Sequence, residues 1–176
     1  MKSTRIFSVL AMLLVAVLCT TNVWAQQQDK SKRPSPPAEA SGKIGNATVK
    51  VDYSSPAVKG RTVWGDMVPY GKVWRAGANE ATTVTFDKAV TVEGKELPAG
   101  KYTLFAIPGE DQWTMVFNKQ TGQWGTQYDE KQDALRVNVK PRKSSAMNER
   151  LKYNVTENGL VLLWENLEVP VTIKAS

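Results

Sequence analysis

The residues best suited to chemistry lie in one segment, VPYGKVWRAGANEAT, which runs from Val68 to Thr82. It combines flat aromatic faces with a guanidinium, an amide and a carboxylate. Proteins use such groups to stack against a small molecule and to fix its orientation. The composition predicts a binding site for a small polar or carbohydrate-like ligand. The candidate ligand-binding residues of this segment are Tyr70, Lys72, Trp74, Arg75, Asn79 and Glu80.

Two other interpretations of the same segment stay open. Arg75 and Glu80 have opposite charges, so they could form an ion pair that fastens an irregular loop against a sheet, in a structural or assembly domain of the cell envelope. Alternatively, Glu80 or Asp66 could serve a hydrolase that works with carboxylates. If the segment is extended, Trp74 and Arg75 point to opposite faces, so one of these two side chains belongs to the core.

A second aromatic cluster follows at WGTQY, from Trp124 to Tyr128. It either forms a second wall of a ligand groove, with Trp124 as a further ligand-binding candidate, or places Trp124 as a cap on one end of the fold. The acidic residues after it, Asp129, Glu130 and Asp133, have no calcium-motif spacing, so a solvated acidic turn is favoured. No metal site and no cofactor are predicted.

The absence of two residue types narrows the reaction classes. The chain has no histidine, and its single cysteine, Cys19, lies in the N-terminal apolar segment. Ser-His-Asp and Cys-His catalysis therefore lack a base or a nucleophile, and the usual zinc, copper and haem sites lack their ligands. A non-enzymatic binding module is the favoured interpretation.

The first 25 residues have the features of a signal peptide. Lys2 and Arg5 precede an apolar run at residues 6–19, and Val23 and Ala25 give the small-residue pattern of a cleavage site. The run is shorter than the roughly 20 apolar residues that a membrane span needs. We therefore expect no membrane span, cleavage near Ala25, and a periplasmic or extracellular protein.

The charge of the chain argues against nucleic acid as a partner. The leader carries two basic residues and no acid, so it accounts for +2 of the net +6 and leaves +4 on the remainder. This excess is modest and spread along the sequence, without the basic stripe that nucleic-acid binding proteins show.

The remainder divides into a linker and one domain. Residues 26–42 lack large apolar side chains and are rich in Pro, Ser and Lys, which predicts a disordered linker. From residue 43 to 176, short stretches alternate apolar and polar residues, as strands do. The step Asn158-Gly159 predicts a hairpin, Pro170 predicts an edge position for the last strand, and a short helix is considered at residues 145–150.

These patterns predict an all-β fold, an antiparallel β-sandwich or jelly-roll-like domain of about nine strands. The stretch at residues 101–107 is apolar on both faces, which is typical of a strand in the middle of a sheet.

Four segments, residues 49–61, 68–82, 97–111 and 123–125, together resemble the secreted bacterial family of unknown function DUF2911. The resemblance extends from about Thr48 to Ile173. It implies an exported β-rich domain, typical of Bacteroidetes-like Gram-negative bacteria. It implies no particular activity, so no catalytic residues are carried over from it.

Overall fold

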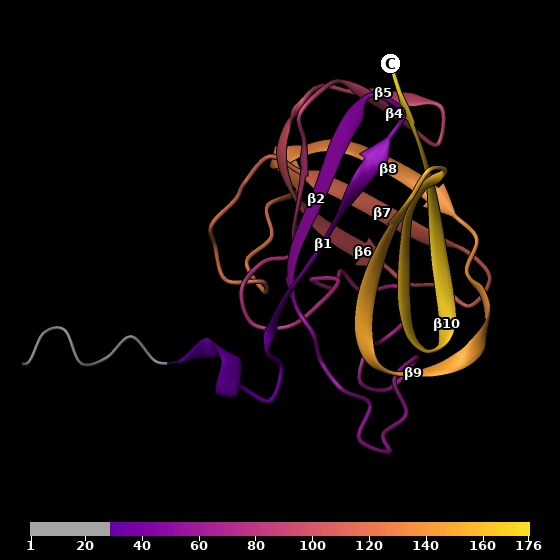
Figure 1. Cartoon of the computed structure of the whole chain (residues 1–176). Helices are drawn as coiled ribbons and strands as arrows, with labels where there is room; N and C mark the ends of the chain where they lie inside the picture. Colours follow the sequence, from indigo (N-terminus) through magenta and orange to yellow (C-terminus); the bar gives the residue numbers. More distant parts are fainter. Residues whose placement is uncertain (1–28) are drawn as a thin grey trace, which may run out of the picture. The chain divides into compact units, whose positions relative to one another are not determined.

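The computed structural model describes residues 29–176, and residues 31–176 form one compact unit built from two antiparallel sheets (Figure 1). The predicted all-β fold is confirmed, with ten strands where about nine were expected. The six-stranded sheet has the order β1 (Pro37–Ile44), β2 (Ala47–Ser54), β3 (Thr83–Phe86), β6 (Gly100–Ile107), β7 (Trp113–Asn118) and β8 (Asp133–Val139). The four-stranded sheet has the order β5 (Lys95–Leu97), β4 (Val90–Val92), β10 (Gly159–Ala175) and β9 (Arg142–Thr156).

Alternating burial explains how the first sheet forms. In β2 the side chains of Ala47, Val49 and Val51 are fully buried, and exposed or half-buried residues separate them. In β6 the residues from Tyr102 to Ala106 are all buried, so both faces of this strand are covered. This strand pairs with β3 on one side and β7 on the other, which confirms the predicted central position.

Four tryptophans join the two sheets. Trp113 on β7 and Trp164 on β10 are buried, and their neighbours Trp64 and Trp74 come from the long connection between β2 and β3, residues 55–82. Trp74 stacks on Trp164 at a centroid distance of 5.8 Å, and Trp64 meets Trp113 edge to face at 4.9 Å. Because aromatic pairs bury large areas, these contacts hold the connection against the core.

Residues 37–42, which the sequence analysis assigned to the linker, lie in β1. This strand pairs along its full length with β2, from Pro37 opposite Ser54 to Ile44 opposite Ala47. Most of its side chains are small, and all but Ile44 are exposed or half-buried, so the composition carries no strand signal. The ladder of backbone hydrogen bonds to a neighbouring strand is what orders it.

Strands β9 and β10 differ from the sequence-based predictions in two respects. The helix considered at residues 145–150 is wrong, because this stretch lies inside β9 and pairs with β10, with Asn148 opposite Glu165. The predicted edge position of β10 is also wrong, since β10 lies between β4 and β9. Pro170 is tolerated there because it falls between Glu168, the last residue paired with β9, and Ile173, the first paired with β4. The hairpin predicted at Asn158-Gly159 is confirmed, and Figure 1 shows β9 and β10 as a long curved pair.

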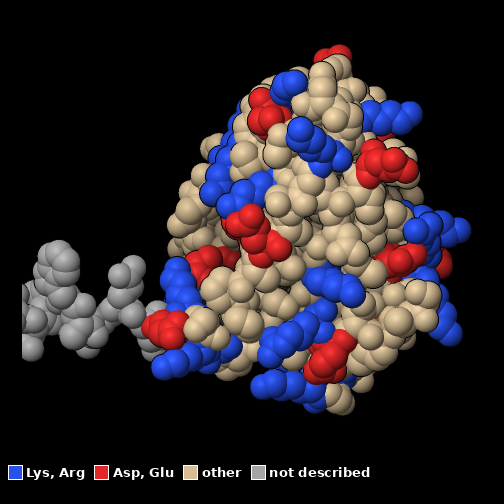
Figure 2. Space-filling model, viewed as in Figure 1, with Lys and Arg blue, Asp and Glu red and all other residues tan. Residues whose placement is uncertain are grey.

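Basic and acidic side chains are interspersed on the face shown in Figure 2. The predicted signal peptide, residues 1–25, lies outside the described residues. Between residues 29 and 176, no helix has the length and apolar character needed to cross a membrane.

Candidate ligand-binding pocket

The connection between β2 and β3 reaches the site because part of it runs along β6. The backbone N–H of Trp74 donates to the carbonyl of Ala106 at 2.7 Å, and the N–H of Ala106 donates back to Trp74 at 2.9 Å. Gly71 donates to the carbonyl of Pro108 at 2.8 Å. Residues 71–74 therefore run beside the end of β6, and Trp74 pairs with Ala106 in an isolated bridge. Successive side chains at such a bridge point to opposite faces. The Trp74 ring packs in the tryptophan cluster, and Arg75 lines a pocket to which Trp74 also contributes.

This pocket has a volume of about 190 Å³ and is open to solvent. It is formed where three parts of the chain meet: the 73–75 segment, strand β6, and the loop after β7. A backbone hydrogen bond from Gly125 to Asn79, 3.0 Å long, joins the third part to the turn that follows the first. The lining residues are Val73, Trp74, Arg75, Phe105, Gly125, Thr126 and Tyr128.

Arg75 is the only charged residue of this lining. Its side chain is half-buried, and this burial lowers the pKa of the guanidinium. Its Nε donates a long hydrogen bond of 3.4 Å to the carbonyl of Gly77. Within residues 29–176, no carboxylate lies within ion-pair distance of the guanidinium. The pocket therefore contains a partly desolvated cation that the described chain does not neutralise.

Gly125 allows Arg75 to occupy this position. A Cβ atom at Gly125 would lie 2.6 Å from Cδ of Arg75 and 2.8 Å from the carbonyl oxygen of Asn79. Both separations are shorter than van der Waals contact, so any side chain at residue 125 would displace the arginine stem or the loop. The glycine is required here for close approach.

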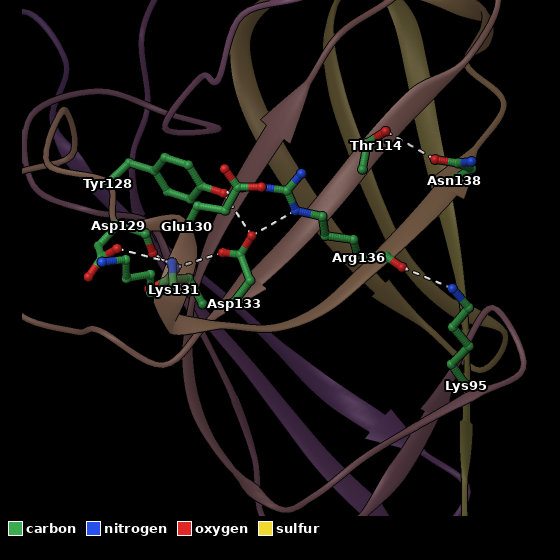
Figure 3. A network of polar contacts seen from close by, with 10 residues as sticks. Lys95, Thr114, Tyr128, Asp129, Glu130, Lys131, Asp133, Arg136 and Asn138 are labelled. Atoms are coloured by element: carbon green, nitrogen blue, oxygen red, sulfur yellow. Dashed lines mark hydrogen bonds and ion pairs between the residues drawn. The ribbon is translucent and has the colours of Figure 1, made fainter.

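A polar network holds Tyr128 of the pocket lining in place, as Figure 3 shows. The Tyr128 hydroxyl donates to Oδ2 of Asp133 at 2.7 Å and accepts from Nη2 of Arg136 at 2.5 Å. Burial, followed by the bond to Asp133, raises the pKa of Tyr128 to about 12. The Tyr128 ring also packs edge to face on Phe105, with centroids 4.9 Å apart. Tyr128 is therefore a rigid wall whose hydroxyl is already engaged.

Asn79 and Glu80 bind a different part of the molecule. Nη1 of Arg33 donates to both carboxylate oxygens of Glu80, at 2.9 and 3.1 Å. The Asn79 amide donates to the carbonyl of Ser35 at 2.9 Å. The ion pair considered between Arg75 and Glu80 is therefore replaced by one between Arg33 and Glu80. This half of the motif fastens the segment before β1.

The comparison with protein families agrees with the four segments noted in the sequence. The family model DUF2911, described as a protein of unknown function, matches residues 35–173. The chain belongs to the DUF2911 family. The match includes all of β1, in agreement with its place in the domain. No curated protein and no solved structure matches the chain.

The other predicted residues of this DUF2911 domain lie outside the pocket lining. Lys72 is exposed, and Tyr70 is 39% exposed with its ring against Gly65. Trp124 is 47% exposed and forms a backbone bridge with Glu80, so it does not cap the core. Its loop contributes Gly125, Thr126 and Tyr128 to the pocket lining, while Trp124 itself is outside it.

Phe105 and Val73 of the DUF2911 domain line the pocket but were not predicted from the sequence. Phe105 lies on the second apolar face of β6, which a strand covered on both sides needs anyway. An apolar residue at this position is therefore already explained by a central strand, and it gives no separate indication of a pocket. Val73 is 40% exposed, and its aliphatic side chain has no functional group that would point to a binding site.

Two residues in the turn after Arg75 have positive φ angles, Ala76 at 49° and Asn79 at 57°. Asparagine tolerates this region, whereas alanine does so at a cost. The turn is held by hydrogen bonds to the Ala76 carbonyl from the hydroxyls of Tyr153, at 2.7 Å, and Thr82, at 3.2 Å. These two buried hydrogen bonds therefore hold the turn in its conformation.

The acidic residues near the pocket also have structural partners. Asp129 accepts a hydrogen bond from the N–H of Lys131 and caps the short 3-10 helix Glu130–Gln132. Asp133 accepts from Asn118 at 2.8 Å in addition to its bonds within the network. Within the described part of the chain, no cluster of His, Cys, Asp and Glu side chains is arranged to hold a metal ion.

Proposed function

We propose that this DUF2911 protein is an exported, non-enzymatic binding module that holds a small polar ligand in the pocket beside Arg75. One observation carries the proposal: a half-buried guanidinium lines a cavity and has no acidic partner within residues 29–176. Burying a cation without a counter-charge costs free energy, and a bound polar or anionic group would recover it. Pockets with apolar walls and few directed polar groups are typical ligand sites.

The hydrolase hypothesis has less support. Glu80 is held by Arg33, and Asp66 is exposed on the β2–β3 connection. Neither carboxylate lines the pocket, and the lining contains no other acid. A pair of facing carboxylates, which glycoside hydrolysis normally needs, is therefore not supplied at this site.

The structural hypothesis gains support for part of the motif. Asn79 and Glu80 hold the segment that precedes β1, through Ser35 and Arg33. The motif therefore combines two tasks in this proposal: one half fastens the N-terminal segment, and Arg75 serves the ligand.

Export is the second element of the proposal, and it is supported by the charged, apolar and small-residue regions of residues 1–25. The intact mass of the protein recovered from the periplasm or medium tests it. We expect a mature chain that starts at Gln26. A full-length mass in the cytoplasmic fraction would contradict export.

The binding proposal is tested by thermal melting of the mature protein with sets of small carboxylates, amino acids and sugars. A ligand present at 100 times its Kd stabilises the fold by about 2.7 kcal/mol, which raises the Tm of a domain of this size by about 5 to 10 °C. Arg75→Gln should abolish the shift. Lys101→Gln, which removes one positive charge from an exposed position on β6, is the matched control. If no compound in the sets shifts the Tm, the binding proposal is wrong.

A further inference from the structure

We infer that the ligand of this pocket is a monocarboxylate with a short apolar body. The inference rests on the proposed binding function and narrows it to one ligand chemistry. Such a carboxylate occurs both in free small molecules and at the C-terminus of a peptide. The experiment below separates these two sources.

The charge of the lining selects for a carboxylate. Arg75 supplies one cation, and no acidic residue lines the pocket. A guanidinium forms two parallel hydrogen bonds with a planar carboxylate, which matches its fork of donors. One cation balances one negative charge. A phosphate group carries up to two charges and three acceptor oxygens, so it would leave part of its charge unbalanced here.

The polar inventory of the lining disfavours a sugar. A sugar presents several hydroxyl donors that need acceptors, and proteins supply these with carboxylate and amide oxygens. The side-chain oxygens of this pocket belong to Thr126 and Tyr128. The Tyr128 hydroxyl is engaged by Asp133 and Arg136. The carbohydrate-like ligand considered from the sequence is therefore a weaker match than a carboxylate.

The apolar residues of the lining determine which kind of group can accompany the carboxylate. Phe105 and Tyr128 pack edge to face at 4.9 Å, and their mutual contact keeps both rings in place. Val73 adds an apolar side chain that is 40% exposed. Phe105 is already buried, so an apolar ligand body placed here would gain free energy by covering the exposed parts of Val73 and Tyr128. The volume of about 190 Å³ is smaller than the roughly 300 to 1,000 Å³ of pockets for drug-sized ligands, so a fragment-sized group fits.

The geometry at Gly125 provides a second, independent way to change the site. A methyl group at this position would lie 2.6 Å from Cδ of Arg75. Gly125→Ala therefore displaces the arginine stem or the adjoining loop without removing the cation. If the carboxylate binds through the position of the guanidinium, and not merely through its charge, this variant also loses affinity.

The experiment is isothermal titration calorimetry with the full mature chain and defined probes. The charged probe is 3-phenylpropionate, and its neutral match is 3-phenylpropanamide. The peptide probes are a tripeptide ending in phenylalanine with a free carboxylate and the same tripeptide with a C-terminal amide. Glucose serves as the sugar probe. The variants are Arg75→Gln, Arg75→Lys, Gly125→Ala and, as control, Lys101→Gln.

We expect at least one free carboxylate to bind and its amide to bind about tenfold or more weakly, since a charge-assisted hydrogen bond is worth about 1.5 to 3 kcal/mol. Arg75→Gln should show the same loss. Arg75→Lys keeps the positive charge but not the two-pronged donor geometry, so its affinity for the carboxylate should lie between those of wild type and Arg75→Gln. Lys101→Gln should stay within about twofold of wild type, because an isolated surface charge contributes little. Circular dichroism of each variant checks that it is folded.

The results separate this inference from the proposed function. Binding of 3-phenylpropionate supports a free small molecule as the source, and binding of the tripeptide carboxylate alone supports a peptide C-terminus. If the amides bind as tightly as the acids, or glucose binds and the acids do not, the carboxylate inference is wrong while the binding module stands. If no probe binds here and no compound of the wider sets shifts the Tm, both are wrong.

Discussion

Arg33 and Glu80, which lie 47 residues apart in the chain, are joined through a single guanidinium nitrogen that contacts both carboxylate oxygens, at 2.9 and 3.1 Å. The contact links the segment before β1 to the end of the β2–β3 connection. Their side chains are 24% and 40% exposed, so water and salt screen the interaction. A contact of this kind orders a segment more than it stabilises the fold.

Breaking this ion pair should therefore have a small effect on stability. We expect Arg33→Gln and Glu80→Gln each to lower the free energy of unfolding by about 0.2 to 1 kcal/mol, with a double variant little worse than either single one. Urea denaturation of wild type, both single variants and the double variant measures these free energies of unfolding. Glu110→Gln, an exposed acid, is the charge-matched control. Fully additive losses would show that Arg33 and Glu80 are not coupled.

Gly125→Ala should lower the free energy of unfolding by about 1 to 3 kcal/mol, the usual cost of overpacking. The added methyl group conflicts with Cδ of Arg75 and with the carbonyl oxygen of Asn79, at 2.6 and 2.8 Å. The exposed neighbour Gln127 offers the control variant Gln127→Ala, which should change stability by no more than about 0.5 kcal/mol. Equal denaturation midpoints for the two variants would contradict the close approach at Gly125.

The tryptophan cluster should dominate the stability of the core. Trp164 is 2% exposed, stacks on Trp74 and meets Trp64 edge to face at 5.6 Å. We expect Trp164→Ala to cost about 3 to 5 kcal/mol. Trp124→Ala removes the same side chain from a position that is 47% exposed and should cost less than about 1 kcal/mol. Chemical denaturation of both variants makes the comparison, and similar losses would refute the assignment of Trp164 to the core.

Stability at low pH should depend on Asp87. The N–H of Thr48 donates to its carboxylate at 2.6 Å, and hydrogen bonding to Thr48 lowers the pKa of Asp87 in the folded state. A lowered pKa contributes stability above the unfolded value of about 3.9, and this contribution is lost as the pH falls through the folded value. Asp87→Asn should therefore flatten the loss of stability below about pH 4.

Thermal melts across the acid range measure this effect. Asp111→Asn removes the same charge from an exposed loop and serves as control. An acid limb of unchanged slope in Asp87→Asn would show that the Thr48 contact does not persist in solution.

The hydroxyl of Tyr128 should titrate at an unusually high pH. Its pKa is raised to about 12 by burial and by the hydrogen bond to Asp133. Because the neutral phenol is favoured in the folded state, its contribution to stability is present below the unfolded pKa of about 10 and is lost as the pH rises toward about 12. The difference in tyrosinate absorbance between wild type and Tyr128→Phe isolates its titration. A difference curve centred near pH 10 would contradict the network in Figure 3.

Most strands were predictable because their signal is local. Alternation of apolar and polar residues in β2 and the turn at Asn158-Gly159 depend only on neighbouring residues. Where the deciding contact comes from a distant strand, the prediction was incomplete. Strand β1, whose residues are mostly small, is ordered by pairing with β2, and the stretch at residues 145–150 is extended because β10 lies beside it.

The sequence by itself determined the membership in DUF2911, the all-β class and the segment that carries Arg75, since each follows from residue types and short spacings. Only the tertiary structure decided the roles inside that segment. It gave Glu80 a partner in Arg33 and brought Arg75, Phe105 and Tyr128 to one pocket from separate parts of the chain. An ion pair or a pocket depends on distances in space, and residues adjacent in an extended segment point to opposite faces, so closeness in sequence does not determine which side chains meet.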